Sequence, residues 1–180
     1  MQSDRDDAFY WLKCHQYPRK WAGEVYALTR WIPLVGLAAP RVIAHKSDTP
    51  AVLMSEMAGA TGDTVDLPPH REEALWRQAG MYLARLHTLE NDWFGAVNVD
   101  GSHQGMPHGD PVAFICHSIE NRLIQGRDEG LFDAAEQAFI VAAANDWTPA
   151  LEGEIPRAIH RDYSPRNWMV AHDGTLTGVI

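Results

Sequence analysis

The chain has 180 residues, of which 46% are hydrophobic and 22% are charged, and its formal net charge is −9. This length and composition are typical of one globular domain or two small lobes, and the acidic balance argues against a protein that binds the phosphate backbone of nucleic acids. The sequence shows no long apolar run and no signal-peptide pattern, and the two cysteines, Cys14 and Cys116, are too few for a disulfide framework, so we expect a cytoplasmic protein without a membrane partner.

The first elements are a strand and a helix. Residues 8–14 are rich in aromatic side chains, which predicts a strand with Lys13 near its end. Residues 19–32 repeat apolar side chains at the spacing of one helix face, and we expect Pro33 to stop this helix, which also contains Glu24. The apolar stripe consists of Trp21, Val25, Leu28 and Ile32.

Two more strands follow, at residues 40–45 and 51–55, with a turn at residues 47–50 between them. The chain leaves the last strand at Glu56 and Met57 and enters a linker over residues 59–69 that is rich in Gly, Pro, Thr and Asp.

The middle of the chain is predicted to be mainly helical. A helix over residues 71–89 has one apolar face, and Gly80 within it suggests close packing. Residues 91–109 are irregular. Asp110-Pro111 is a favourable start for a further helix that ends at Gly126, and apolar spacing predicts another helix over residues 131–142. The face of the first of these helices is formed by Leu75, Ala79, Tyr82, Leu83 and Leu86.

The end of the chain is predicted to be a hairpin. Residues 168–170 form an apolar run, Asp173-Gly174 is a two-residue turn signal, and residues 175–180 form the return strand.

The most informative stretch is residues 159–167, which contain the pattern His160-x-Asp162-x4-Asn167. Phosphoryl transfer needs a positioned hydroxyl group and neutralised phosphate charge rather than covalent help from the protein. A carboxylate at Asp162 can orient the attacking hydroxyl, and the neutral carbonyl of Asn167 can ligate Mg2+. Pro165 stiffens the loop between them. The pattern resembles the catalytic loop of the protein-kinase-like superfamily, and most of all that of the aminoglycoside phosphotransferase family.

This resemblance implies an α+β, protein-kinase-like, two-lobed fold, with a partial nucleotide-binding lobe over residues 1–58 and a partial, mainly helical lobe over residues 59–180. It implies transfer of the γ-phosphoryl group of ATP or GTP to a hydroxyl group of a small molecule, with Mg2+ as cofactor. Asp162 would be the catalytic residue, Asn167 the metal ligand, and His160 a brace of the loop. No motif specifies the substrate or the oligomeric state.

Four further residues take roles from the same resemblance. Lys13 in a strand, followed by Glu24 in a helix, matches the order of the kinase ion pair, in which the lysine contacts the nucleotide phosphates and the glutamate holds its ammonium group. Backbone groups at Glu56 and Met57 would bind the adenine as a hinge does. Without the resemblance, Lys13 and Glu24 would be interpreted as ordinary surface charges. Glu56 and Met57 would be interpreted as an ordinary exit from a strand.

The chain also departs from the family pattern. Many members have glycine where Arg161 and Arg166 stand, and Arg166 could reach a phosphate or form a surface salt bridge. A metal-binding aspartate usually follows the strand that ends here at Ile180, and two strands with a phosphate-covering loop usually precede the lysine strand. We therefore expect a fragment of a larger phosphotransferase that is weakly active or inactive by itself.

Two other functions remain open. A kinase-like shell could bind a nucleotide or metabolite without transferring phosphate. A metal-dependent hydrolase would use His160 and Asp162 as ligands, but the sequence has no second His and Asp cluster at suitable spacing, and His103 and His108 lack matching ligands as well. Nucleotide binding and zinc-dependent hydrolysis would distinguish these alternatives.

Overall fold

The computed structural model describes residues 9–180, which form two compact units. Unit 1 contains the described residues up to Leu89 together with Val97–Ser102 and Ala158–Ile180, and unit 2 contains Glu90–Ala96 and His103–Arg157. The N-terminal strands and the loop at residues 159–167 therefore belong to the same unit. The functional division into lobes at residue 58 stays a prediction.

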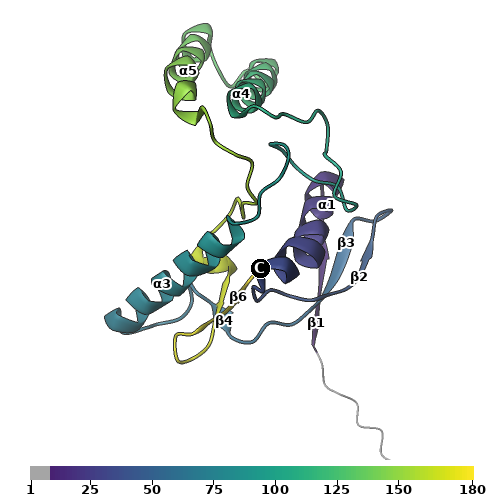
Figure 1. Cartoon of the computed structure of the whole chain (residues 1–180), viewed down its shortest axis with the longest axis vertical. Helices are drawn as coiled ribbons and strands as arrows, with labels where there is room; N and C mark the ends of the chain where they lie inside the picture. The colour runs from purple at the N-terminus through teal and green to yellow at the C-terminus, as the bar shows by residue number, and fades with distance from the viewer. Residues whose placement is uncertain (1–8) are drawn as a thin grey trace, which may run out of the picture. The chain divides into compact units, whose positions relative to one another are not determined.

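The first sheet of unit 1 has three antiparallel strands in the order β1–β3–β2 (Figure 1). The pairing of β1 with β3 runs from Tyr10 opposite Ser55 to Cys14 opposite Ala51. All three predicted strands are confirmed, with shifts of one or two residues at their ends, and Ala8 lies outside the described residues. The strands are β1 (Tyr10–Cys14), β2 (Val42–Lys46) and β3 (Ala51–Ser55).

The predicted helix after β1 is present but longer than expected. α1 (Pro18–Tyr26) continues through a π-helical turn, η1 (Ala27–Trp31), into α2 (Ile32–Val35). The expected stop at Pro33 is therefore wrong. The wider π turn lets the proline enter at the start of α2, where its missing N–H is not needed. The helix ends instead at Gly36, which has the left-handed φ of 60° that glycine adopts readily.

The first helix packs directly on this sheet (Figure 1). The indole Nε1 of Trp21 donates a hydrogen bond to the carbonyl oxygen of Ala51, at 3.0 Å, and so ties α1 to β3. This packing fixes the turn of α1 that carries Glu24. The buried cluster between helix and sheet consists of Trp21, Ala22, Val25, Val52 and Met54.

A second sheet of unit 1 is built from β4 (Ala60–Thr61), β5 (Trp168–Val170) and β6 (Leu176–Val179), in the order β4–β5–β6. The predicted hairpin between β5 and β6 is confirmed, but its turn is longer than the two residues expected. The amide of Ala171 donates to the carbonyl of Thr175 at 2.9 Å and so closes a loop over residues 172–174. The strand β4 lies within the predicted linker and was not expected, because two residues are too short to show a pattern.

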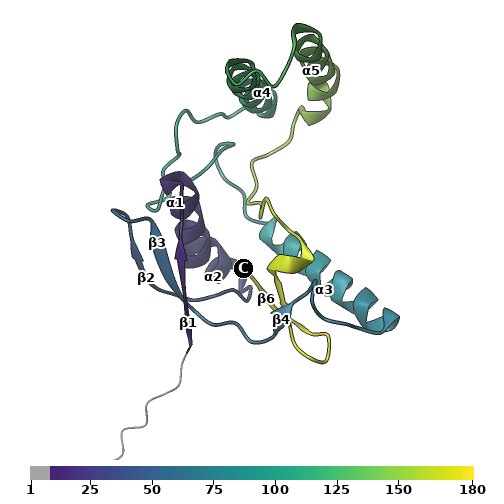
Figure 2. The same ribbon diagram turned by 180° about the vertical axis from the view of Figure 1, so that it is seen from behind.

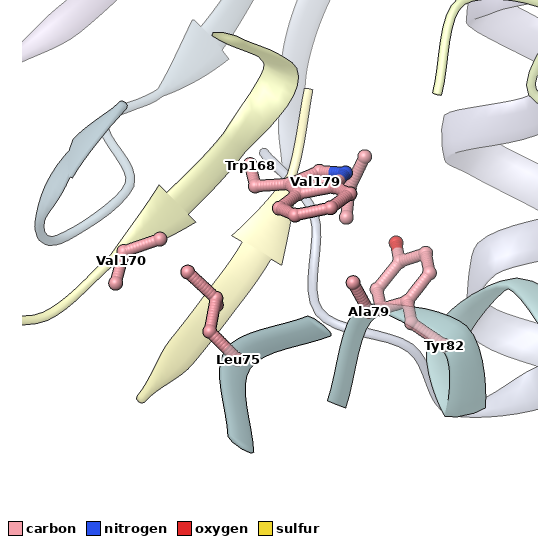
Figure 3. Packing of buried hydrophobic residues seen from close by; sticks show 6 residues of the cluster. All are labelled: Leu75, Ala79, Tyr82, Trp168, Val170 and Val179. Carbon is pink, nitrogen blue, oxygen red and sulfur yellow. The ribbon is translucent and has the colours of Figure 1, made fainter. Parts of the chain in front are cut away.

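α3 (Pro69–Leu86) covers this second sheet and confirms the helix predicted there. Trp168 is 1% exposed at the centre of the contact. Gly80 is exposed, and a Cβ atom built on it would meet no atom within 4 Å. The interpretation of Gly80 as a close-packing position is therefore wrong. Figure 3 shows the core cluster, formed by Leu75, Ala79, Tyr82, Trp168, Val170 and Val179.

Unit 2 is mainly the helical pair α4 (Pro111–Asp128) and α5 (Ala134–Trp147), with the short η2 (Thr148–Leu151) after it (Figure 2). Asp110 caps α4 as expected, since its Oδ1 accepts from the amide of Ala113 at 2.7 Å. The predicted end at Gly126 is wrong, because this glycine lies inside the helix and makes room for the ring of Phe132. None of the helices within residues 9–180 is long and apolar enough to cross a lipid bilayer.

The second helix of the pair begins later than predicted. The prediction placed its start at Leu131, whereas α5 begins at Ala134, after a capping box formed by Asp133 and Glu136. The box satisfies two backbone N–H groups at the helix start, which explains the later boundary.

Candidate active site

The predicted ion pair between Lys13 and Glu24 is present. The Nζ atom of Lys13 lies 2.8 Å from Oε2 and 3.0 Å from Oε1 of Glu24, so one ammonium group bridges both carboxylate oxygens. The Lys13 side chain is 49% exposed and that of Glu24 is 23% exposed. An ammonium group has three N–H donors. The pair therefore presents a fixed cation at the end of β1 that is accessible to an anionic ligand.

The structure also brings Asp162 and Asn167 together. The Nδ2 atom of Asn167 donates a hydrogen bond to the backbone carbonyl of Asp162 at 2.7 Å, and the amide of Ser164 donates to the same carbonyl at 3.1 Å. Asn167 ends the short helical turn η3 (Pro165–Asn167), which leads directly into β5. Because the NH2 group of Asn167 is engaged, its carboxamide oxygen is the atom left for a cation.

The carboxylate of Asp162 is exposed and forms an ion pair with Arg166. The Nη2 atom of Arg166 lies 3.2 Å from Oδ1 of Asp162. Arg166 therefore forms a surface salt bridge, which is one of the two roles that the sequence allowed for it. The hydrogen bond from Arg166, followed by that from Asn167, lowers the pKa of Asp162 below its usual value. The carboxylate is thereby kept ionised, as an acceptor of a hydroxyl proton must be.

His160, at the start of the loop, is half-buried. Its ring lies edge-on to that of Tyr163, with ring centroids 5.4 Å apart. Burial lowers the pKa of His160. Smaller effects raise it, among them a backbone hydrogen bond with Ile180, the charge of Asp162 and, last, the charge of Glu24. A neutral imidazole suits a brace of the loop.

Tyr163 connects the loop to the core, a role that sequence reasoning missed. Its hydroxyl donates a hydrogen bond to the carbonyl oxygen of Ala79 in α3 at 2.7 Å. Its ring also packs against Tyr82 and Trp168, at centroid distances of 6.3 and 5.4 Å. An aromatic residue inside an otherwise polar loop was the available signal, because such a side chain usually has an apolar surface to cover.

Arg161 has a φ of 69°, in the left-handed region that favours glycine. This is one of the two positions where many family members carry glycine. A residue with a Cβ atom costs about 1 kcal/mol or more in this conformation. The turn before Asp162 therefore places Arg161 in a conformation that glycine would adopt at lower cost.

The other two predicted binding residues lie in the connection between the two sheets. The amide of Glu56 donates to the carbonyl of Phe9 at 3.3 Å, which continues the pairing of β3 with the chain before β1. The side chain of Met57 contacts Gly178 in β6. Among residues 9–180, no hydrogen bond or ion pair joins Glu56 or Met57 to the other predicted site residues, which are Lys13, Glu24, Asp162 and Asn167.

The metal-dependent hydrolase alternative finds no support. Within the described part of the chain, no group of three or more His, Cys, Asp or Glu side chains could hold a metal ion. His160 and Asp162 therefore have no third ligand of that kind, and neither have His103 and His108.

The strand order, the Lys13–Glu24 pair and the loop before β5 define the class of this chain as a kinase-like α+β fold. A solved structure with the same fold is the gentamicin complex of APH(2")-IIa, with a TM-score of 0.67 and 18% sequence identity; the match covers 97% of this chain and 58% of that chain. The model of the phosphotransferase enzyme family, APH, matches residues 16–180, so the chain belongs to this family. No protein of curated function matches it.

Proposed function

We propose that this chain carries part of the nucleotide site and the catalytic loop of a phosphotransferase that moves the γ-phosphoryl group of ATP or GTP to a hydroxyl group of a small molecule. The observation that carries this proposal is the bidentate Lys13–Glu24 pair in the same compact unit as the loop at residues 160–167. Family membership supports the reaction class, and the gentamicin-bound neighbour supports a small-molecule substrate.

The proposed roles follow from the chemistry of each group. Lys13 binds the nucleotide phosphates, and Glu24 holds its ammonium group in place. Asp162, kept ionised by Arg166, accepts a hydrogen bond from the attacking hydroxyl and orients it. The free carboxamide oxygen of Asn167 fits Mg2+, which prefers oxygen ligands and would neutralise phosphate charge.

The adenine is proposed to bind at the connection after β3. The amide of Glu56 is already bonded to Phe9, so the carbonyl of Glu56 and the backbone of Met57 are the groups proposed for the base. We place the reaction in the cytoplasm, since Cys14 and Cys116 are free thiols, as a reducing compartment would keep them.

Calorimetric titration of the chain with Mg·ATP and Mg·GTP tests this proposal. We expect saturable binding that Lys13→Met weakens at least ten-fold, because the variant removes the phosphate-binding cation, an effect of about 1.4 kcal/mol or more. Lys46→Met is the matched control, since Lys46 is an exposed lysine on β2 of the same sheet, and it should bind like the unmodified chain. Equal affinities of the two variants, or no binding to either nucleotide, would contradict the proposal.

A second candidate function is nucleotide binding without transfer. The observation that favours it is the ion pair of Arg166 with Asp162, because the guanidinium group already engages Oδ1, one of the two carboxylate oxygens that could accept a substrate hydroxyl. Incubation with labelled ATP and a panel of hydroxylated small molecules, gentamicin among them, separates the two candidates. Binding without label transfer, both before and after Arg166→Gly, would favour the non-catalytic module.

A further inference from the structure

We propose that His15 is a positioning residue of the Lys13–Glu24 pair: in its neutral form it holds Glu24 in place for Lys13, and in its protonated form it competes with Lys13 for the same carboxylate. This inference rests on the proposed nucleotide site and adds a third residue to it. The predicted consequence is a nucleotide affinity that falls when His15 takes up a proton.

The backbone places His15 beside the pair. His15 follows β1 directly and is two residues after Lys13, so in extended chain the two side chains point to the same face of the sheet. The amide of His15 donates to the carbonyl of Pro50 at 2.8 Å, which continues the pairing of β1 with β3 by one more residue. This hydrogen bond fixes the backbone position from which the ring reaches Glu24 in α1.

The side-chain contact involves one carboxylate oxygen. The Nε2 atom of His15 lies 3.3 Å from Oε2 of Glu24, and the Nζ atom of Lys13 lies 2.8 Å from the same oxygen. The His15 side chain is 8% exposed, and its Nε2 atom is buried without a well-directed hydrogen bond. A buried polar nitrogen without a partner costs free energy. A small shift of the ring would let a neutral Nε2–H donate to Glu24.

The charges around His15 determine its effect. Glu24 and Lys20 face it from α1 and Lys13 faces it from β1, whereas Pro50 on the side of β3 is uncharged. Burial, as the largest cause, lowers the pKa of His15; Glu24 acts in the opposite direction, and the two lysines lower it further. His15 is therefore neutral at pH 7. In acid, a proton on the ring adds a positive charge next to Lys13 and draws Oε2 of Glu24 away from it.

Affinity for Mg·ATP, measured by calorimetry at pH 7.5 and pH 5.5, tests the inference with two variants. His15→Gln keeps an N–H donor that does not titrate, and His15→Phe fills the space without a donor. We expect the affinity of the unmodified chain, relative to that of His15→Gln, to fall about five-fold between pH 7.5 and pH 5.5, a factor typical of a partly exposed ion pair. Taking the ratio of the affinities of the two proteins at each pH cancels the effect of the protonation of ATP itself. His15→Phe should bind more weakly at both pH values.

His45→Gln is the matched control, because it removes an exposed histidine from β2 of the same sheet, and its affinities should follow those of the unmodified chain at both pH values. If His15→Gln also follows the unmodified chain at pH 5.5 while Mg·ATP still binds, the inference is overturned and the proposed function stands. If the unmodified chain binds no Mg·ATP, both are overturned.

Titration of the His15 ring protons by NMR gives a readout without nucleotide. Because the charge of Glu24 acts to raise the pKa of His15, Glu24→Gln should move the midpoint of this titration to lower pH. An unchanged midpoint for His15 would show that its ring does not interact with Glu24, and the positioning role would be excluded whatever the affinities.

Discussion

Two helices of equal length, α3 in unit 1 and α4 in unit 2, are covered very differently. Each has 18 residues and a proline at its start, but α3 buries four side chains and α4 buries only Gly126. The sheet β4–β5–β6 lies against α3 (Figure 3), whereas α4 and α5 border an open apolar groove lined in part by Ile119, Leu123 and Ile140. The four buried residues of α3 are Leu75, Ala79, Tyr82 and Leu86.

This difference shows that capping and propensity suffice to form a helix but not to position a site. α4 is well capped by Asp110, and yet its apolar residues Ile115, Ile119 and Leu123 are only half-buried. The loop at residues 160–167 depends on the packed helix, because the hydroxyl of Tyr163 donates a hydrogen bond to Ala79 in α3 and its ring packs on Trp168. The geometry of Asp162 should therefore be sensitive to changes under α3 and insensitive to comparable changes in unit 2.

The largest expected effect comes from removing the central side chain of the packed region. Trp168→Ala should lower the free energy of unfolding by about 3–5 kcal/mol, because it leaves a cavity in a site that is 1% exposed. Trp147→Ala in α5 removes the same side chain where it is 75% exposed and should change stability by less than about 0.5 kcal/mol. Urea unfolding followed by circular dichroism measures both, and similar losses would remove the contrast between the two units.

A pair of glycine substitutions sharpens the comparison within unit 1. In Gly178→Ala the new Cβ atom would lie 2.7 Å from the carbonyl oxygen of Ala38 and against Met57, so we expect a loss of about 1–3 kcal/mol. In Gly80→Ala the new atom meets nothing within 4 Å on an exposed helix face, and we expect a gain of up to about 1 kcal/mol. Thermal unfolding should show melting temperatures that move in opposite directions. A stabilising Gly178→Ala would mean that β6 does not pack as described.

The smallest expected effect is a dependence of stability on pH. Burial lowers the pKa of His160 from 6.5, so the folded chain favours the neutral ring. The unfolded chain then binds the proton more readily, and stability is full above about pH 6.5 and is lost as the pH falls below it. Urea midpoints measured between pH 7.5 and pH 5.5 should fall for the unmodified chain and fall less for His160→Gln. Parallel pH profiles would argue against a neutral, buried His160.

Sequence patterns predicted the elements whose signals are local. The spacing of Trp21 and Val25 gave the buried face of α1, and the order of Lys13 and Glu24 gave a contact that the structure contains. The pattern from Asp162 to Asn167 predicted a loop. In the structure the side chain of Asn167 closes that loop through its hydrogen bond to the backbone carbonyl of Asp162.

Features that depend on neighbours distant in sequence could not be predicted. Pro33 continues a helix because a π turn precedes it, and Gly126 lies inside a helix because the ring of Phe132 packs there. The sequence spacing does not specify which rotamer Arg166 adopts, so it did not decide whether this side chain pairs with Asp162. His15 was missed because its burial depends on α1, although its position two residues after Lys13 was a usable signal.

The most direct test of the central claim is a double-mutant cycle on Mg·ATP affinity with Lys13→Met, Asn167→Ala and the two combined. If Lys13 and the loop before β5 bind one nucleotide, each single variant should weaken Mg·ATP binding by about 1 kcal/mol or more, and the double variant should bind more weakly than either. An affinity of Asn167→Ala equal to that of the unmodified chain would show that Asn167 does not act on the nucleotide that Lys13 binds, and would contradict the account.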